Sequence, residues 1–249
     1  MTESSNSPVA IVTGAAGGIG SALVDVLLRD GYRVIAEDIS PKVQDMARPG
    51  SVVPFQADVT QPETATQAVE LANSSFGRLD LLVNNAAHFL RKSVLDTTDE
   101  DFDRLLTTNV RGAFFHVRAA IPSLAASQGN IINLGSISGL VGSANQSVYS
   151  ITKGALVQLT RQLAIELAPQ RIRVNAVAPG AVDTDFAAKG TPVADPDPEA
   201  SRLDVLARHP LGRTSTPQDI AEAIGFLVSP KASGITGVIL SVDGGYVAR

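Results

Sequence analysis

Short β-branched segments alternate along the chain with longer amphipathic segments, and this alternation restricts the fold more than any other feature of the sequence. The predicted strands occupy residues 9–14, 32–39, 51–56, 79–86, 129–136, 171–180 and 237–245. The predicted helices occupy residues 19–29, 62–76, 99–124, 148–167 and 217–227. Strands separated by helices pair in parallel, because the chain crosses over the sheet between them. We therefore predict an α/β fold with a doubly wound parallel sheet of about seven strands and helices on both faces.

The length of 249 residues suits one large domain of this class, and no change of composition divides the chain. We expect a flexible polar tail at residues 1–7 and a single domain at residues 8–249. Residues 186–210 interrupt the alternation with prolines and acidic residues, which favours a mobile flap over a core element. The sequence Thr98-x-x-Asp101 is a capping box and predicts the start of the helix at residue 99.

The residue types that are rare or absent exclude several kinds of site. The chain has no cysteine, which excludes disulfides, thiolate nucleophiles and cysteine-bound metals. Its three histidines, His88, His116 and His209, are far apart in sequence, so we expect no metal site. The net charge of -5 and the lack of a basic patch argue against nucleic acid as a partner. The polar first residues and the absence of long apolar runs predict neither a signal peptide nor a membrane span, and we expect a cytoplasmic protein.

A glycine-rich turn, TGAAGGIG at Thr13–Gly20, joins the first predicted strand to the first predicted helix. Gly14, Gly18 and Gly20 would let a phosphate approach bare backbone, where the helix start offers free N–H groups and a positive dipole end. The spacing is not a strict GxGxxG, and the lysine of a P-loop is missing. Taken alone, the turn is an ambiguous indication of nucleotide binding.

An acidic residue strengthens the nucleotide interpretation. Asp38 ends the second predicted strand, eighteen residues after Gly20, where a carboxylate can accept hydrogen bonds from an adenosine ribose. The same charge repels a 2′-phosphate, so the sequence favours NAD over NADP. The simpler alternative is that Asp38 only caps the next turn.

A tyrosine and a lysine stand four residues apart in the segment SVYSITKGAL. On a helix this spacing places Tyr149 and Lys153 one above the other on the face that also carries Leu156 and Leu163. Lysine is normally kept off an apolar face. A lysine that reaches out to water along that face is the structural alternative to a chemical role.

With these residues in view, the chain resembles the short-chain dehydrogenase/reductase family from Val9 to Gly245. The resemblance rests on motifs in the family's order. These are TGxxxGxG at Thr13–Gly20, DV at Asp58–Val59, NNA at Asn84–Ala86, TNV at Thr108–Val110, Ser136 thirteen residues before Tyr149, YxxxK at Tyr149–Lys153, PGAVDT at Pro179–Thr184 and VDGG at Val242–Gly245. Each motif is weak or moderate alone, but the set is specific. It implies a Rossmann-type fold.

The resemblance also implies roles for individual residues. Tyr149 would be the general acid and base, Lys153 would lower its pKa and bind the nicotinamide ribose, Ser136 would hold the substrate oxygen, and Asn109 would position a water. The implied cofactor contacts are Gly14, Gly18, Ile19, Gly20, Asp38, Asp58, Val59, Asn85, Ala86, Lys153, Pro179, Gly180, Val182 and Thr184. The family usually has glycine where this chain has Ala87, which would be strained if that position required a positive φ.

The expected function is therefore NAD(H)-dependent interconversion of a secondary alcohol and a ketone. Candidate substrate-lining residues are His88, Ser138, Gln146 and Phe186, together with Val141. This mixture of polar and apolar side chains favours a small polyol, sugar or hydroxy-ketone over a steroid. We expect His116 to be a packing or interface residue and His209 to be part of the flap.

Other functions remain to be weighed against this one. A 3-oxoacyl-acyl-carrier-protein reductase that uses NADPH is the nearest alternative, and Asp38 argues against it. A nucleotide sensor without catalysis would be expected to lose Tyr149 or Lys153. The SxxK motif Ser150–Lys153 lacks the SDN and KTG elements that a penicillin-recognising enzyme needs. By resemblance we expect a homotetramer, paired partly through the helices at 99–124 and 148–167.

Overall fold

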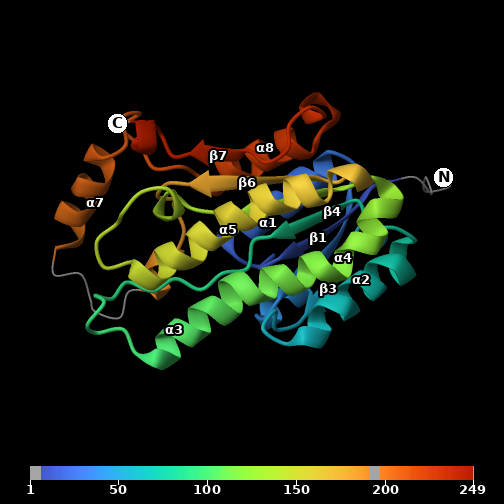
Figure 1. Cartoon of the computed structure of the whole chain (residues 1–249), viewed down its shortest axis with the longest axis horizontal. Coiled ribbons are helices and arrows are strands. Elements are labelled where there is room, and N and C mark those ends of the chain that lie inside the picture. Colours follow the sequence, from blue (N-terminus) through green and yellow to red (C-terminus); the bar gives the residue numbers. More distant parts are fainter. Residues whose placement is uncertain (1–6, 191–196, 249) are drawn as a thin grey trace.

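The computed structural model describes residues 7–190 and 197–248 and contains one parallel sheet of seven strands. The strand order is β3-β2-β1-β4-β5-β6-β7, which confirms the doubly wound sheet (Figure 1). The strands are β1 (Val9–Thr13), β2 (Arg33–Asp38), β3 (Val52–Gln56), β4 (Leu81–Asn84), β5 (Asn130–Leu134), β6 (Arg173–Pro179) and β7 (Ile239–Val242). Each lies within a predicted strand.

Helices cover both faces of the sheet. On one face lie α1 (Gly18–Arg29) and α8 (Pro217–Val228), which pack against Ala10 and Val12 of β1. On the other face lie α2 (Pro62–Phe76), α4 (Ala113–Ser127) and α5 (Ser147–Glu166), which pack against Val9 and Ile11 of the same strand. Successive residues of a strand point to opposite faces, so a continuously apolar strand supplies both cores.

The helix predicted at residues 99–124 has an irregular centre. It consists of α3 (Asp99–Leu106), the π-helical turn η2 (Thr107–Gly112) and α4, without a break. The capping box at its start is confirmed, since the Thr98 hydroxyl accepts the Asp101 N–H at 3.2 Å and the Asp101 carboxylate accepts the Thr98 N–H. Nothing in the local sequence predicted the π-turn.

Residues 186–210 are more regular than expected. They contain α6 (Phe186–Lys189) and α7 (Pro198–Ala207), while residues 191–196 lie outside the described part of the chain. Pro198 stands at the first position of α7, where its missing N–H and fixed φ favour a helix start. Asp197 caps that start by accepting the Ala200 N–H at 3.0 Å. Proline at this position therefore starts a helix rather than breaking one, and the flap role of residues 186–210 stays a prediction.

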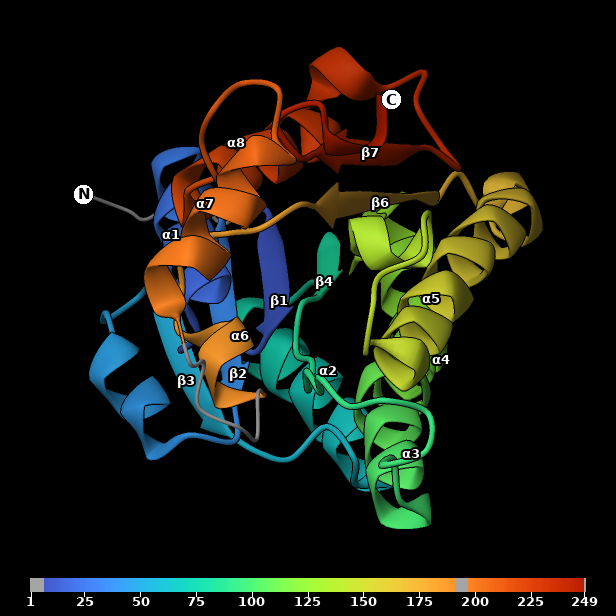
Figure 2. The ribbon, with the colours of Figure 1, turned by 90° about the vertical axis from the view of Figure 1, so that its left-hand side faces the viewer.

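Short 3₁₀ turns complete the connections: η1 (Pro41–Met46), η3 (Ile137–Gly139), η4 (Ala168–Gln170), η5 (Pro230–Ala232) and η6 (Tyr246–Ala248). Figure 2 looks onto the edge at which the strands end, where α6 and α7 lie. Ligands of open α/β sheets bind at this edge.

Candidate active site

The structure brings the candidate residues to one edge of the sheet. The glycine-rich turn follows β1, Asp38 ends β2, Asn85 follows β4, Ser136 follows β5, and Pro179 ends β6. In a parallel sheet all these positions share the carboxyl edge. Their grouping follows directly from the strand order.

Three glycines of the glycine-rich turn, Gly14, Gly18 and Gly20, have no room for a side chain. Gly14 has a φ of +66°, and a Cβ there would lie 2.9 Å from the Cα atom of Ala86. A Cβ on Gly20 would overlap the carbonyl oxygen of Gly14, and one on Gly18 would lie 2.5 Å from the Thr184 side chain. Gly17 precedes α1 without a side-chain cap, so the first N–H groups of this helix keep their capacity to bind an anion. The turn fits a pyrophosphate.

Hydrogen bonds fix this turn to the loop after β4. The Thr13 hydroxyl accepts the N–H groups of Asn85 at 3.1 Å and Ala86 at 3.0 Å. The Asn85 amide in turn donates to the carbonyl oxygens of Thr13 and Gly14, both at 2.9 Å. Asn85 and Ala86 therefore shape the site through the backbone of the glycine-rich turn.

Asp38 uses both carboxylate oxygens. One accepts the Ala16 N–H at 2.9 Å, and the other accepts the Ser40 N–H at 2.8 Å. The Ser40 bond is the turn cap that we gave as the simpler alternative. Each oxygen retains a further lone pair for a ribose hydroxyl, so capping and ribose binding are compatible at this residue.

Tyr149 and Lys153 lie on the buried face of α5, with exposed fractions of 7% and 2%. Lys153 Nζ is 5.6 Å from the centre of the Tyr149 ring and donates to the carbonyl oxygen of Leu134 at 2.6 Å. Tyr149 shares a hydrogen bond with the Ser136 side chain. Lys153 thus does not reach out to water, and the chemical role of the pair stays a prediction.

Burial dominates the electrostatics of this pair. It raises the pKa of Tyr149 well above its ordinary value, and the hydrogen bond to Ser136 offsets only part of that rise. Burial also lowers the pKa of Lys153 to about 7. In the protein without cofactor, the pKa of Tyr149 is therefore raised, whereas the proposed role of Lys153 is to lower it. Lowering its pKa requires a positive charge close to the phenol.

Asn109 connects two segments of the site. It lies in the π-turn η2 and is buried, with an exposed fraction of 1%. Its side-chain oxygen accepts the His88 N–H at 2.7 Å, and its amide donates to the His88 carbonyl at 2.9 Å and to the Thr152 hydroxyl at 3.0 Å. The side chain thus joins the loop after β4 to α5 beside Lys153. Its water-positioning role stays a prediction.

Three of the candidate substrate residues, Ser138, Gln146 and Phe186, make side-chain contacts in the structure. The Ser138 hydroxyl donates a hydrogen bond to the Gln146 side chain at 2.8 Å. Each group can form further hydrogen bonds. Phe186 lies 5.9 Å from Phe89, and Phe89 packs edge-on against Tyr149 with ring centres 4.8 Å apart. The sequence reasoning missed Phe89, although an aromatic residue just after a strand end was a usable signal.

The remaining cofactor candidates are held in loops at the same edge. Asp58 accepts the Thr60 N–H at 2.9 Å, and Val182 forms a bridge with Ser215. Ile19 packs from α1 against the core on that face of the sheet. Ala87 has no positive φ, because the non-glycine residues with positive φ among those described are Gln128, Asn145 and Arg171. The strain considered for Ala87 is therefore absent.

His209 has a larger role than a flap residue. It is buried, and its Nε2 accepts the Ala181 N–H at 3.3 Å while Nδ1 donates to the Val205 carbonyl at 2.6 Å. A Cβ on Gly180 would lie 2.9 Å from His209 Nε2. The imidazole therefore ties the loop after β6 to the last turn of α7, a connection that sequence reasoning did not find.

A parallel sheet with a glycine-rich turn after its first strand and a buried Ser-Tyr-Lys group at its carboxyl edge defines a nucleotide-dependent oxidoreductase. The chain belongs to the short-chain dehydrogenase/reductase family. Residues 14–247 match the family described as enoyl-(acyl carrier protein) reductase. Proteins of this family bind a nicotinamide dinucleotide.

Individual relatives cover the whole chain. A cis-4-hydroxycyclohexanecarboxylate dehydrogenase of Sinomonas cyclohexanicum is 40% identical, with 100% of both chains covered. The structure of a 3-ketoacyl-(acyl-carrier-protein) reductase from Brucella melitensis, complexed with NADH, has a TM-score of 0.88 and 34% identity, covering 98% of this chain and 99% of that one. ElxO with NADP bound has a TM-score of 0.88 and 30% identity, covering 98% and 100%.

No helix in residues 7–190 and 197–248 is long and apolar enough to span a membrane. Within the same residues, no group of three or more histidine, aspartate or glutamate side chains is arranged to hold a metal ion.

Proposed function

We propose that this protein is an NAD(H)-dependent oxidoreductase that interconverts a secondary alcohol and a ketone, with Tyr149 as general acid and base. The observation that carries the proposal is the burial of Tyr149 and Lys153 together, with Ser136 bonded to the phenol, at the sheet edge that also holds the glycine-rich turn. A buried lysine without a carboxylate partner is costly for stability, which favours a chemical use of its charge.

The residues divide the work of proton transfer. The Ser136 hydroxyl holds the substrate oxygen beside the Tyr149 hydroxyl, which donates a proton to a ketone or accepts one from an alcohol. Because burial raises the pKa of this phenol, its ionisation needs the Lys153 ammonium close to it. Asn109 makes hydrogen bonds to the backbone of His88 and to the Thr152 hydroxyl. These bonds fix the distance between the loop after β4 and α5.

The nicotinamide dinucleotide fits the residues present. Gly14, Gly18 and Gly20 leave bare backbone that would accommodate the pyrophosphate at the start of α1, and Ile19 would be a further contact. Asp58, Val59, Asn85, Ala86, Pro179, Gly180, Val182 and Thr184 would form the rest of its binding site, with Lys153 at the nicotinamide ribose. When bound, the nicotinamide ring supplies or accepts the hydride at the substrate carbon.

Asp38 supports NAD over NADP. Its carboxylate is fixed by two N–H groups at the end of β2, where an adenosine ribose would lie. A 2′-phosphate brought close to this carboxylate would meet charge repulsion. The solved relatives include both an NADH complex and an NADP complex, so the proposed preference for NAD rests on Asp38.

For the substrate we propose a small polyol, sugar or hydroxy-ketone. Ser138 and Gln146 offer hydrogen bonds, while Phe89 and Phe186 offer flat apolar surface against the carbon face of a compact ring. His88 stands in the loop after β4, and burial lowers the pKa of its imidazole, which favours the neutral form. The 40% identical relative is named for a hydroxylated cyclohexane acid, which has the same combination of ring and polar groups.

The test is a binding and turnover experiment with the purified protein. NADH and NADPH are titrated by calorimetry, and a panel of cyclic alcohols, polyols and hydroxy-ketones is then assayed in both directions. We expect tighter binding of NADH and turnover of at least one secondary alcohol. Tight NADH binding without turnover on the whole panel would favour a nucleotide sensor.

A 3-oxoacyl-acyl-carrier-protein reductase is the second candidate. It is favoured by the 34% identical reductase of that kind from Brucella melitensis, whose complex holds NADH. Reduction of acetoacetyl thioesters at a higher kcat/KM than any free alcohol or ketone in the panel would establish it in place of the first proposal.

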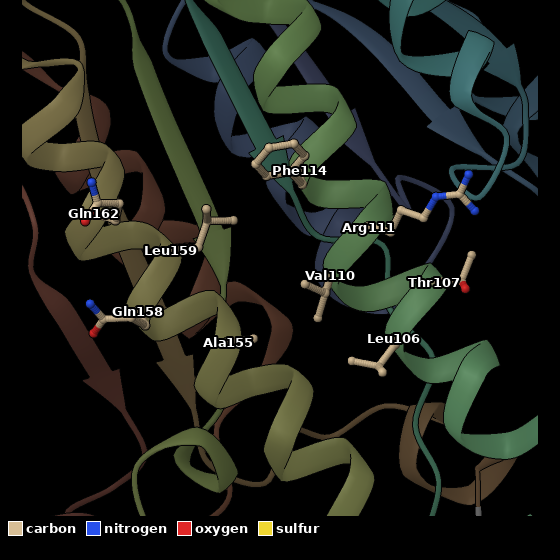
Figure 3. A pocket seen from close by; sticks show the side chains of 9 residues that line it. All are labelled: Leu106, Thr107, Val110, Arg111, Phe114, Ala155, Gln158, Leu159 and Gln162. Atoms are coloured by element: carbon tan, nitrogen blue, oxygen red, sulfur yellow. The ribbon is translucent and has the colours of Figure 1, made fainter. Parts of the chain in front are cut away.

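We also propose that the single domain at residues 8–249 assembles as a homotetramer in the cytoplasm. An apolar groove of about 660 Å³ separates η2 and α4 from α5, on the face of α5 turned away from Tyr149. Figure 3 shows Val110 and Leu159 projecting between the two helices. Phe114, at the same groove, is 46% exposed. Phe114→Glu should lower the mass measured by sedimentation, and an unchanged mass would exclude this face as an interface.

A further inference from the structure

A buried pair of ionisable side chains lies outside the proposed reaction. Glu37, near the end of β2, has an exposed fraction of 0%, and His116, in the first half of α4, has one of 1%. His116 Nε2 is 3.1 Å from each carboxylate oxygen of Glu37, and Nδ1 is 2.9 Å from the carbonyl oxygen of Gly112. His116 was expected only as a packing or interface residue.

Both nitrogens of this imidazole face oxygen atoms, so the ring donates two hydrogen bonds when it is protonated. Burial lowers the pKa of His116, but the hydrogen bond and charge of Glu37 and the Gly112 carbonyl outweigh it, and the pKa lies above its ordinary value. A buried ion pair of this kind stabilises a fold little compared with apolar side chains of similar volume. Its contribution to stability is therefore a weak reason for its presence.

On the side of β2, the pair adjoins the adenosine half of the cofactor site. The backbone carbonyl of Glu37 accepts the Ala15 N–H at 3.0 Å, and the next residue, Asp38, accepts the Ala16 N–H. The end of β2 thus holds the glycine-rich turn through two successive residues. A shift of Glu37 would move the turn and the carboxylate of Asp38 together.

On the side of α4, the pair adjoins the π-turn. Gly112 is the last residue of η2, and its carbonyl is the second acceptor of His116. Gly112 also lies against the loop after β3, because a Cβ there would be 3.0 Å from the carbonyl oxygen of Val59. His116 therefore fixes the end of the π-turn, where Gly112 lies against Val59, a proposed adenine contact.

We propose that Glu37 and His116 are positioning residues for cofactor binding, which set the end of β2 and the Val59 loop at the correct separation around the adenosine. The inference rests on the proposed function, since it assumes that the dinucleotide binds at this edge. It assigns to the pair a role in affinity for the adenosine half rather than in proton transfer. Asn109 keeps its own hydrogen bonds to His88 and Thr152, so the catalytic side of the turn is held independently.

The decisive variant is Glu37→Leu/His116→Leu, which removes both charges and keeps an apolar pair of similar size. We expect its unfolding temperature to stay close to that of the wild type, because no unpaired charge is left buried. We expect the Kd for NADH and for ADP-ribose to rise by the same factor of about ten, since displacement of binding groups by a fraction of an ångström has effects of this size. The KM for NAD should rise equally, with kcat changed by less than about threefold.

Two further variants keep the test decisive. Glu37→Gln retains the shape and one hydrogen bond, so it should fold and bind ADP-ribose more weakly than the wild type but more tightly than the double variant. Asp80→Asn is the matched control: Asp80 is buried at the opposite end of the sheet, where it accepts the Val9 N–H and pairs with Arg78. This control should lower the unfolding temperature without changing the Kd.

The outcomes separate the inference from the function on which it rests. Wild-type affinity for ADP-ribose in both Glu37 variants would overturn the positioning role, as would a fall in kcat at unchanged KM. An equal loss of affinity in Asp80→Asn would also overturn it, because the effect would then be a general one. If the wild-type protein binds neither NADH nor NADPH, the proposed function itself fails.

Discussion

Replacement of Lys153 by methionine tests the electrostatic argument at the centre of the site. Methionine has a similar length and no charge, and the side chain that it replaces is 2% exposed. Burial lowers the pKa of Lys153 from 10.5 to about 7. At 1.36 kcal/mol for each pKa unit, holding the ammonium here costs the folded protein about 5 kcal/mol. Loss of the hydrogen bond to the Leu134 carbonyl offsets about 1–3 kcal/mol of this gain.

The pH dependence gives this prediction its sign. Between pH 7 and 10.5 the unfolded chain binds more protons at this residue than the folded chain, so the free energy of unfolding of the wild type rises with pH in that window. The cost of the buried ammonium is fully present below pH 7 and gone above 10.5. Lys153→Met should therefore exceed the wild type in stability by about 2–4 kcal/mol below pH 7. The advantage should shrink, and then reverse, as the pH is raised.

The assay is urea unfolding at several pH values between 6 and 9, without added cofactor, together with turnover of the best substrate. Lys231→Met is the control, because Lys231 is exposed to solvent, and its stability should follow the wild-type curve in parallel. Turnover of Lys153→Met should be lost at every pH. A variant that is less stable than the wild type by a constant amount, or that remains active, would refute the reasoning.

Three other predictions concern single residues. Tyr149→Phe should preserve the edge-on contact with Phe89 and the Kd for NADH, while kcat falls by about 10²–10⁴ in a steady-state assay; substantial residual turnover would remove the proposed acid. Asp38→Asn removes the charge and keeps one of the two acceptor oxygens that bind the Ala16 and Ser40 N–H groups. The preference for NADH over NADPH measured by titration should fall by about tenfold or more; an unchanged preference would show that the selectivity depends on other residues. Asp219 caps α8 at Thr216 and pairs with Arg213, and that arginine and the cap lower its pKa to about 2. Since the pair is partly exposed, Asp219→Asn should cost about 1 kcal/mol at pH 7. The difference should narrow below pH 4, because a carboxylate with a lowered pKa loses its stabilising effect on acidification.

The sequence predicted those parts of the fold that local patterns determine. The strands were identifiable because β-branched residues are buried on both faces of the sheet, as Ile11 is on one face and Val12 on the other. The start of α3 was identifiable because a capping box is a local interaction. The helix α7 was missed because proline was interpreted as a breaker, although at a first position it starts a helix.

The candidate site was predicted less completely, because its geometry depends on residues far apart in the chain. Motif positions predicted that Ser136, Tyr149 and Lys153 belong to one site, and the structure brings these side chains close to the end of β5. No local pattern connects Glu37 with His116, which are 79 residues apart in sequence. The same holds for His209 and Ala181, whose contact depends on how α7 returns to the loop after β6. Such contacts form only in the folded chain, where the sheet brings segments that are distant in sequence close together, so no local sequence pattern predicts them.

The π-turn shows why a functional site departs from local preference. A π-turn is less favourable than an α-helical turn and needs compensation from elsewhere. Here the compensation is the set of three hydrogen bonds that the Asn109 side chain makes with His88 and Thr152. An uninterrupted α-helix would change the direction of residue 109, since each inserted residue rotates the following positions by about 100°. The irregular turn is therefore the means by which one helix meets both the loop after β4 and the helix that carries Lys153.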